Sequence, residues 1–172
     1  MTTGAEALVK TLADCGVEAC FANPGTSEMH FVAALDRVEG MRCVLGLFEG
    51  VCSGAADGYY RITGKHGVCI GQNGPGITNF VTAIAAAYWA HSAVVAITPE
   101  TGSLSIGLGG FQETDQLPIF SKITKYQAHV NNQARMAELT ARAFDRAILE
   151  MGPTQLNIPR DFLYGELECE IP

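Results

Sequence analysis

Apolar runs of five to eight residues alternate along the chain with segments in which apolar residues recur every three or four positions. Six of the runs are typical of buried strands, at 17–22, 42–47, 67–71, 93–98, 123–130 and 154–158. The periodic segments predict helices at about 4–15, 27–38, 49–63, 77–89 and 132–151. Because strands and helices alternate with short connections, the sequence predicts an α/β fold, a three-layer α/β/α sandwich with a mainly parallel sheet of about six strands.

Local signals set the ends of two predicted helices. Thr3 and Glu6 have the spacing of a capping box, and Gly16 is expected to end the helix that they begin. Thr26 is the predicted N-cap of the second helix. After the last strand, residues 161–172 predict an acidic tail rather than another element.

Ligands bind doubly covered parallel sheets beyond the carboxyl ends of the strands. Four segments rich in glycine and polar residues follow predicted strands and should therefore meet at that edge: Asn23–Thr26, Phe48–Glu49, Gln72–Gly76 and 100–115. The last segment has no sustained period and contains four glycines, so we expect a long functional loop.

Residues 47–65 place one carboxylate, Glu49, before a helix built mostly from glycine, alanine, serine and cysteine. Val51, Ala55 and Ile62 fall on one stripe of this helix. Each glycine costs about 1 kcal/mol of helix propensity relative to alanine, so we expect tight packing around Glu49. Two interpretations of Glu49 remain open. In the first, Glu49 complements the helix dipole, an interaction worth up to about 1 kcal/mol. In the second, burial favours the protonated form of Glu49 and makes it an acid/base group.

The composition narrows the classes of function. The 172 residues are enough for one domain with a core, and 17% charged residues leave a surface lean in charge, which favours large buried interfaces. A formal net charge of −7 argues against binding to nucleic acid or to an anionic membrane. We expect a cytoplasmic protein, since the sequence has no apolar run of 18 residues and no basic amino-terminal leader.

Six cysteines lie mostly within apolar runs and never as C-x-x-C, so buried, reduced thiols are expected. The four histidines show no metal-ligand spacing, and no metal site is assigned to this chain.

Residues 47–65 resemble the signature HE-x-x-A-x-x-A-A-D-G-Y-A-R-x-T-G-K of the pyrimidine-binding (PYR) domain in thiamine-diphosphate enzymes. The superfamily includes acetolactate synthase, sulfoacetaldehyde acetyltransferase and sulfopyruvate decarboxylase. In that family the glutamate contacts the cofactor's aminopyrimidine, and the matching residue here is Glu49. Phe48 stands where many members carry histidine or glutamine.

Three further segments resemble family motifs in the family's order. Asn23–Thr26 resembles an N-P-G-[ST] element near bound substrate and pyrimidine, Gln72–Asn79 resembles a G-P-G-x-T-N loop beside the cofactor, and Phe111–Glu113 resembles an F-Q-E on a loop over the active site. The resemblance implies Glu49 and Gln112 as catalytic residues. It implies as cofactor-binding residues Pro24, Gly25, Thr26, Glu49, Gln72, Gly74, Pro75, Gly76, Asn79 and Phe111.

The family holds the diphosphate and its Mg²⁺ in a second (PP) domain through a G-D-G motif followed by asparagine. Here only Ala56-Asp57-Gly58 comes close, and it belongs to the glutamate signature. The resemblance therefore implies that residues 1–165 are a PYR domain, followed by an acidic tail at 166–172. It also implies that the binding site for thiamine diphosphate is completed by a partner PP subunit, which holds the Mg²⁺.

The enzyme so implied is a two-subunit carboligase or decarboxylase acting on a small 2-oxo acid, assembled as a heterotetramer of two PYR and two PP chains. Three alternatives stay open: the alpha subunit of a sulfopyruvate- or phosphonopyruvate-type decarboxylase, a non-catalytic regulatory subunit that kept the fold, and a piece of a longer enzyme.

Overall fold

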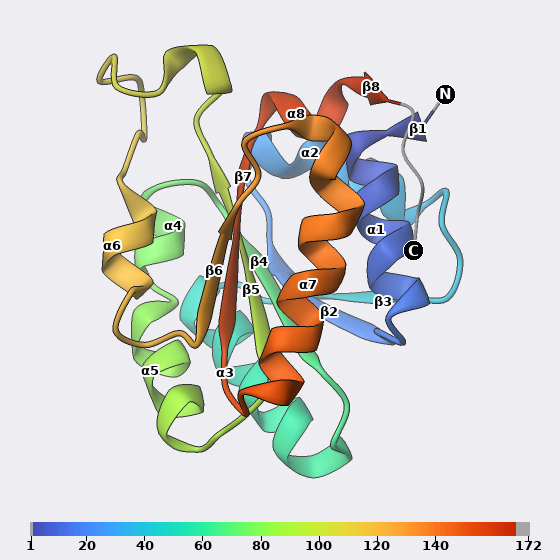
Figure 1. Cartoon of the computed structure of the whole chain (residues 1–172), viewed down its shortest axis with the longest axis vertical. Coiled ribbons are helices and arrows are strands. Elements are labelled where there is room, and N and C mark those ends of the chain that lie inside the picture. Colours follow the sequence, from blue (N-terminus) through green and yellow to red (C-terminus); the bar gives the residue numbers. More distant parts are fainter. Residues whose placement is uncertain (1, 168–172) are drawn as a thin grey trace.

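The computed structural model describes residues 2–167 of the chain (Figure 1). The strands are β1 (Thr2–Thr3), β2 (Ala19–Asn23), β3 (Arg42–Leu45), β4 (Gly67–Gly71), β5 (Val94–Glu100), β6 (Tyr126–His129), β7 (Thr154–Pro159) and β8 (Glu166–Leu167). The α-helices are α1 (Gly4–Asp14), α2 (Met29–Leu35), α3 (Glu49–Thr63), α4 (Pro75–Thr78), α5 (Val81–Trp89), α6 (Gln116–Phe120), α7 (Met136–Leu149) and α8 (Asp161–Tyr164). Short 3₁₀ helices are η1 (Thr26–Glu28), η2 (Ser103–Ser105) and η3 (Gln133–Arg135).

The central sheet has six strands in the order β3-β2-β4-β5-β7-β6, and every neighbouring pair is parallel. All seven residues of β5, at the centre, are buried, as an apolar strand covered on both faces should be. The α/β class and the six-stranded parallel sheet predicted from the alternating pattern are therefore confirmed.

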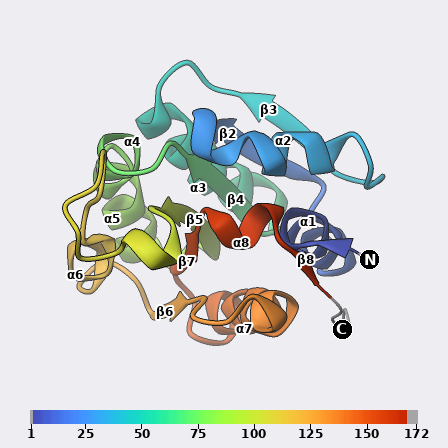
Figure 2. The same ribbon diagram turned by 90° about the horizontal axis from the view of Figure 1, so that it is seen from above.

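Helices cover both faces of this sheet (Figures 1 and 2). One hydrophobic core joins one face to α1, α2, α7 and α8, and a second core joins the other face to α3, α4, α5 and α6. Within β4, Val68 and Ile70 point into the first core and Cys69 into the second, which is the two-residue alternation of a strand. The three-layer sandwich is confirmed.

Two expectations for helix starts had different outcomes. The capping box is present, because the Glu6 amide bonds to Thr3 Oγ1 at 3.2 Å and the Thr3 amide bonds to Glu6 Oε2 at 3.0 Å. The prediction of Thr26 as an N-cap is wrong. Thr26 begins η1, and the residue that satisfies a free amide there is Glu28, whose Oε2 accepts from the Gly25 amide at 2.8 Å.

The helix predicted at 77–89 is divided into α4 and α5. At the division, the amides of Asn79 and Phe80 bond to carbonyls three residues back, those of Gly76 and Ile77, as in a 3₁₀ turn. Similar local changes shorten two other predictions. The strand expected at 123–130 covers only Tyr126–His129, and the helix expected at 132–151 covers only Met136–Leu149, after the short η3.

The prediction of a tail from residue 161 is wrong for the described part of that segment. Residues 161–164 form α8, and β8 pairs with β1 in an antiparallel ribbon in which Thr2 lies opposite Leu167. The predicted domain boundary at residue 165 thus falls between α8 and β8. Residues 168–172, the rest of the predicted acidic tail, lie outside the described residues.

The stripe predicted for α3 faces outward. Val51 and Ile62 are 58% and 86% exposed, whereas Cys52 and Ala56 are buried against the sheet. Close backbone packing occurs on the buried side, where a Cβ on Gly67 would overlap the carbonyl of Ala56. Among the helix glycines, only Gly50 is tightly packed, since a Cβ on Gly54 would meet only Ala83 at 4.0 Å and one on Gly58 would meet nothing within 4 Å. The expected tight packing is therefore wrong for Gly54 and Gly58, and the apolar stripe is left uncovered by the rest of residues 2–167.

The described cysteines form no disulfide. Cys20, Cys52 and Cys69 are buried, Cys15 is half-buried and Cys43 is exposed on the edge strand β3, so the expectation of burial is wrong for Cys43. Cys169 lies outside the described residues. None of the helices within residues 2–167 combines the length and the apolar character that crossing a bilayer requires.

Candidate functional site

Glu49 is the first residue of α3 and lies at the carboxyl edge of the sheet. The extended backbone of Phe48, with φ −155°, turns the chain from β3 into the helix. The Glu49 side chain is only 7% exposed, and its Oε2 accepts a hydrogen bond from Asn79 Nδ2 at 3.0 Å. Its Oε1 has no hydrogen-bond partner among residues 2–167. The carboxylate is therefore held by one oxygen and free to accept at the other.

Glycines make room for this carboxylate. A Cβ built on Gly76 would lie 2.7 Å from Glu49 Oε1 and 2.9 Å from Gln72 Cβ, both too close for a real side chain. A Cβ on Gly71 would lie 3.1 Å from Glu49 Cγ. Gly74 has φ +73°, a conformation that favours glycine, and Pro75 follows at the first position of α4. The Gly-Pro-Gly turn thus packs its backbone directly against Glu49.

Glu28 joins the loop after β2 to the loop after β4. It is fully buried, its Oε2 accepts from the Gly25 amide at 2.8 Å, and its Oε1 accepts from the Asn73 amide at 3.3 Å. Burial raises the pKa of Glu28, while the two amide donors act in the opposite direction. The motif comparison missed this residue, although its position three residues after Gly25 is the spacing of a helix-capping carboxylate.

We predict that Glu28→Gln lowers the free energy of unfolding by about 1–3 kcal/mol, because the amide can accept only one of the two buried N–H groups and leaves the other unsatisfied. Urea denaturation of the two proteins measures this difference. Glu39→Gln is the matched control, since Glu39 is exposed and its substitution is expected to stay within about 0.5 kcal/mol of the original. Equal losses in both variants would contradict the role of Glu28.

The loop from 101 to 115 rises above the sheet edge (Figure 1) and is shaped by Glu113. The Glu113 carboxylate accepts from the Gly110 amide at 2.9 Å and also from the Gly107 amide, and these donors lower the pKa of Glu113. Gln112 has φ +63°, and its carbonyl sits where a Cβ on Gly74 would be. The loop therefore packs its backbone on the Gly-Pro-Gly turn beside Glu49.

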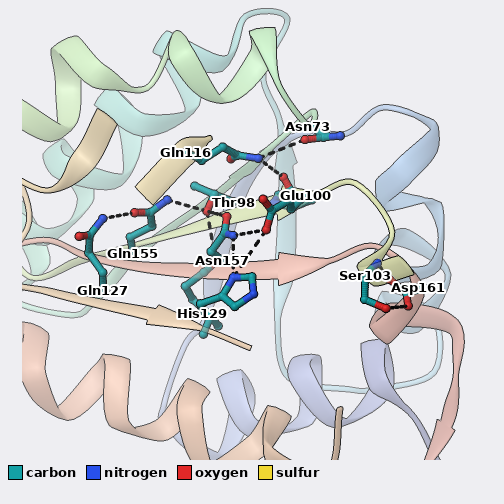
Figure 3. A network of polar contacts seen from close by, with 12 residues as sticks. Asn73, Thr98, Glu100, Ser103, Gln116, Gln127, His129, Gln155, Asn157 and Asp161 are labelled. Atoms are coloured by element: carbon teal, nitrogen blue, oxygen red, sulfur yellow. Dashed lines mark hydrogen bonds and ion pairs between the residues drawn. The ribbon is translucent and has the colours of Figure 1, made fainter. Parts of the chain in front are cut away.

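A second polar cluster, also unanticipated, ties together the ends of β5, β6 and β7 (Figure 3). Asn157 Nδ2 donates to Glu100 Oε2 at 2.5 Å and lies 3.1 Å from His129 Nδ1, and Thr98 Oγ1 donates to Asn157 Oδ1 at 2.9 Å. Burial raises the pKa of Glu100, partly offset by Asn157 and His129. The sequence signal was available, since Glu100 and Asn157 both lie at the carboxyl ends of predicted strands.

Gln116 connects this cluster to the glycine turn. Its Nε2 donates to the Pro99 carbonyl at 2.7 Å and to Asn73 Oδ1 at 3.1 Å (Figure 3). The amide of Asn73 in turn donates to Glu28 Oε1. Buried hydrogen bonds thus run from β5 through the loop after β4 to the loop after β2. This chain of contacts fixes the spacing of the loops around Glu49.

The predicted site residues fall into two groups. Glu49, Gln72, Gly76 and Asn79 are in direct contact. Some of the others reach this group through a neighbour: Gly25 packs on Gln72, Gly74 and Pro75 form the turn before Gly76, and the backbone of Gln112 packs on Gly74. The rest make no such contact: Pro24 is half-buried next to Gly25, Thr26 lines a separate cavity, and Phe111 is 89% exposed.

A cavity of about 500 Å³ opens next to Glu49 between α3 and the α4–α5 segment. It is lined by Phe48, Gly50, Val51, Thr78, Asn79, Thr82, Ala83 and Ala86. The ring of Phe48 packs over Gly50, where a Cβ would be 2.5 Å from its Cε1. At this position the wall is therefore apolar.

A known family model, described as the N-terminal TPP binding domain of thiamine pyrophosphate enzymes, matches residues 2–119. The chain belongs to the thiamine pyrophosphate enzyme family. Thiamine pyrophosphate is thiamine diphosphate under another name, so the family that residues 47–65 resembled is confirmed. The matched range contains Glu49, the Gly-Pro-Gly turn and Gln112.

Several curated relatives are similar to this chain over nearly all of its 172 residues. Sulfoacetaldehyde acetyltransferases of Alcaligenes xylosoxydans xylosoxydans and Castellaniella defragrans are 59% and 54% identical to it, over 94% and 99% of this chain. A probable acetolactate synthase large subunit of Methanocaldococcus jannaschii is 37% identical over 97% of this chain. The chain spans 28% of the length of each of these relatives.

Proposed function

We propose that this chain supplies the aminopyrimidine half of a thiamine-diphosphate site and that Glu49 is its proton-exchanging residue. The observation that carries the proposal is the buried Glu49 carboxylate, held at Oε2 by Asn79 and unpartnered at Oε1. When bound, the cofactor supplies the carbanion chemistry by which this family breaks and forms bonds next to carbonyl groups. The protein's task is to position that cofactor and to exchange a proton with it.

The residues around Glu49 fit such a group. An aminopyrimidine ring carries ring nitrogens that bond to a carboxyl group, and the buried Glu49 carboxylate keeps its Oε1 unpartnered among residues 2–167 for such a bond. Glu49 would hold the pyrimidine N1′ and exchange a proton with it. Asn79 would keep the carboxyl group in place while that proton moves, and Gln72 would form the adjoining wall.

The diphosphate half of the site would lie outside residues 2–167. Among these residues no cluster of three or more metal-ligating side chains is found, and the Mg²⁺ of the cofactor would be held by a PP domain carrying the G-D-G and asparagine ligands. The sequence led us to expect that domain on a partner subunit in a heterotetramer, and this stays a prediction. The relatives' greater length is compatible with a PP domain on the same polypeptide as well.

The surface of α3 and α5 supports such an assembly. Val51, Ile62 and Trp89 are exposed, and the last of these is 81% exposed. Gly54 and Gly58 each cost helix propensity, yet a Cβ on Gly58 would meet nothing within 4 Å and one on Gly54 would meet only Ala83 at 4.0 Å. Large apolar side chains and bare glycines on one face are typical of a surface that another backbone approaches closely.

For the reaction, we propose acyl transfer that starts from a small 2-oxo acid, with a sulfonated aldehyde as the second substrate. The 59% and 54% identities to sulfoacetaldehyde acetyltransferases support this choice over an acetolactate synthase activity, which the 37% identity to a synthase subunit represents.

Titration with thiamine diphosphate tests the proposal. The 172-residue chain with Mg²⁺ is expected to bind the cofactor at least about 10²-fold more weakly than the enzyme assembled with its PP domain, because the charge-assisted contacts to the diphosphate are missing. Calorimetry on both proteins, with circular dichroism to confirm that the chain is folded, measures the ratio. Tight, stoichiometric binding by the 172 residues alone would mean that the diphosphate site lies within this chain.

A further inference from the structure

A second cavity, of about 280 Å³, lies at the same edge of the sheet between η1, the start of α2, and α8. Figure 2 shows α8 crossing this edge, with α2 beside it as in Figure 1. The cavity is lined by Thr26, Ser27, His30, Arg160 and Tyr164. Every one of these side chains can donate a hydrogen bond, and none is a carboxylate.

Arg160 brings a positive charge to this cavity. Its guanidinium is always protonated, and it makes no ion pair with any carboxylate of residues 2–167. The acidic residues next to this cavity in sequence are bonded elsewhere. Asp161 accepts from the Ser103 amide at 2.7 Å and from Ser103 Oγ at 2.6 Å, and Glu28 accepts from the Gly25 and Asn73 amides.

Two of the other donors, His30 and Tyr164, pack against each other beside this charge. The ring of Tyr164 packs against His30 with centroids 4.9 Å apart and planes tilted by 41°. The hydroxyl groups of Thr26, Ser27 and Tyr164 have no hydrogen-bond partner among residues 2–167. Donors from η1, α2 and α8 thus surround one cavity with a fork-shaped cation at its side, an arrangement that suits an anion with three oxygens better than a planar carboxylate with two.

We propose that this cavity binds a tetrahedral oxyanion, the sulfonate or phosphate group of a small substrate. The choice of a sulfonate rests on the function proposed above, and the recognition of the anion rests on Arg160 and its neighbours alone. The cavity is connected to the Glu49 site by packing, because Thr26 follows Gly25, Gly25 packs on Gln72, and Gln72 meets Gly76. The charged end of a substrate would therefore be held along the edge of the sheet that carries Glu49.

The test is a direct binding measurement on the assembled enzyme, without turnover. Isothermal titration with isethionate (2-hydroxyethanesulfonate) and, separately, with inorganic phosphate should show binding that Arg160→Gln weakens by about 10- to 100-fold, the usual cost of a charged hydrogen-bond partner. Arg42→Gln is the matched control, because Arg42 is also exposed and unpaired among residues 2–167 but begins β3 at the opposite edge of the sheet.

A second variant guards against an indirect effect. Tyr164→Phe keeps the ring against His30 and removes only the hydroxyl group, so it should weaken binding of the same anion by about 3- to 10-fold. If the variants weaken the binding of isethionate alone, the ligand is a sulfonate, and if they weaken the binding of phosphate alone, it is a phosphate. If they weaken the binding of both, the cavity is a general oxyanion site. Thiamine-diphosphate affinity, measured in parallel, should not change, which separates this proposal from that for Glu49. No binding of either anion by the original protein, or equal weakening in Arg42→Gln, would overturn it.

Discussion

Replacing Glu49 with glutamine is expected to lower kcat of the assembled enzyme by about 10²–10⁴-fold, the usual loss when a positioned acid/base group is removed. Glutamine has the size of glutamate and can still bond to Asn79, but it cannot exchange a proton at the position of Oε1. Folding should survive, because a neutral amide replaces a buried carboxylate without loss of packing. Steady-state turnover at saturating cofactor and Mg²⁺ measures the effect, and thermal unfolding checks the fold.

Asp57→Asn provides a control in the same helix. Asp57 is also a buried carboxylate of α3, but it is paired with Arg61, Oδ2 to Nη2 at 2.6 Å, and does not touch the Glu49 site. The substitution should affect stability and leave kcat at the original value. If Glu49 served only to complement the helix dipole, Glu49→Gln would cost a few tenths of a kcal/mol of stability and leave turnover intact.

Gly76→Ala is expected to lower kcat by about 10²-fold without unfolding the protein. The new methyl group would lie 2.7 Å from Glu49 Oε1 and 2.9 Å from Gln72 Cβ, so both side chains must move to admit it. Glu49 Oε1 is the end of a flexible side chain and can shift, whereas Gln72 Cβ moves only with its backbone, so some loss of stability is expected as well. A misplacement of a catalytic group by about 1 Å is enough to cost about 10²-fold in rate. Turnover and the urea unfolding midpoint of the same preparation measure the two effects separately.

Gly110→Ala is the matched substitution for Gly76→Ala. Gly110 has an ordinary negative-φ backbone, and a Cβ there would meet its nearest neighbour, Thr101 Oγ1, at 3.7 Å. This variant should keep the original turnover. A Gly76→Ala enzyme that is as active as the Gly110→Ala enzyme would show that the position of Glu49 does not limit the reaction.

The sequence predicted the sheet, and the meeting of Glu49 with the Gly-Pro-Gly turn at its edge, because both depend on local patterns. Continuous apolar runs such as 67–71 indicated strands buried on both faces, and the parallel arrangement then placed the segments that follow the strands at one edge. Glu49 and the Gly-Pro-Gly turn met there as expected. The capping box of Thr3 and Glu6 was equally local and is present.

What could not be predicted depends on contacts between distant segments. The 3₁₀ turn that ends α4 contains Asn79, which bonds to Glu49, thirty positions earlier in the chain. Glu28 follows the Asn23–Thr26 turn in the sequence, and no local pattern indicates that it is buried and accepts from the amide of Asn73, in the loop after β4. Thr26 matched a cofactor motif, but α8 brings Arg160 beside it in a separate cavity. Periodicity and spacing carry no information about such pairings.

The most direct test of the role of Glu49 is the rate at which the proton on C2 of bound thiamine diphosphate exchanges with deuterium. Rapid quenching of the assembled enzyme in D₂O, followed by NMR of the released cofactor, gives this rate independently of substrate. We expect Glu49→Gln to slow the exchange by about 10²–10⁴-fold while the cofactor stays bound. Equal rates in the original and Glu49→Gln enzymes would remove Glu49 from the mechanism and favour a non-catalytic role for the chain.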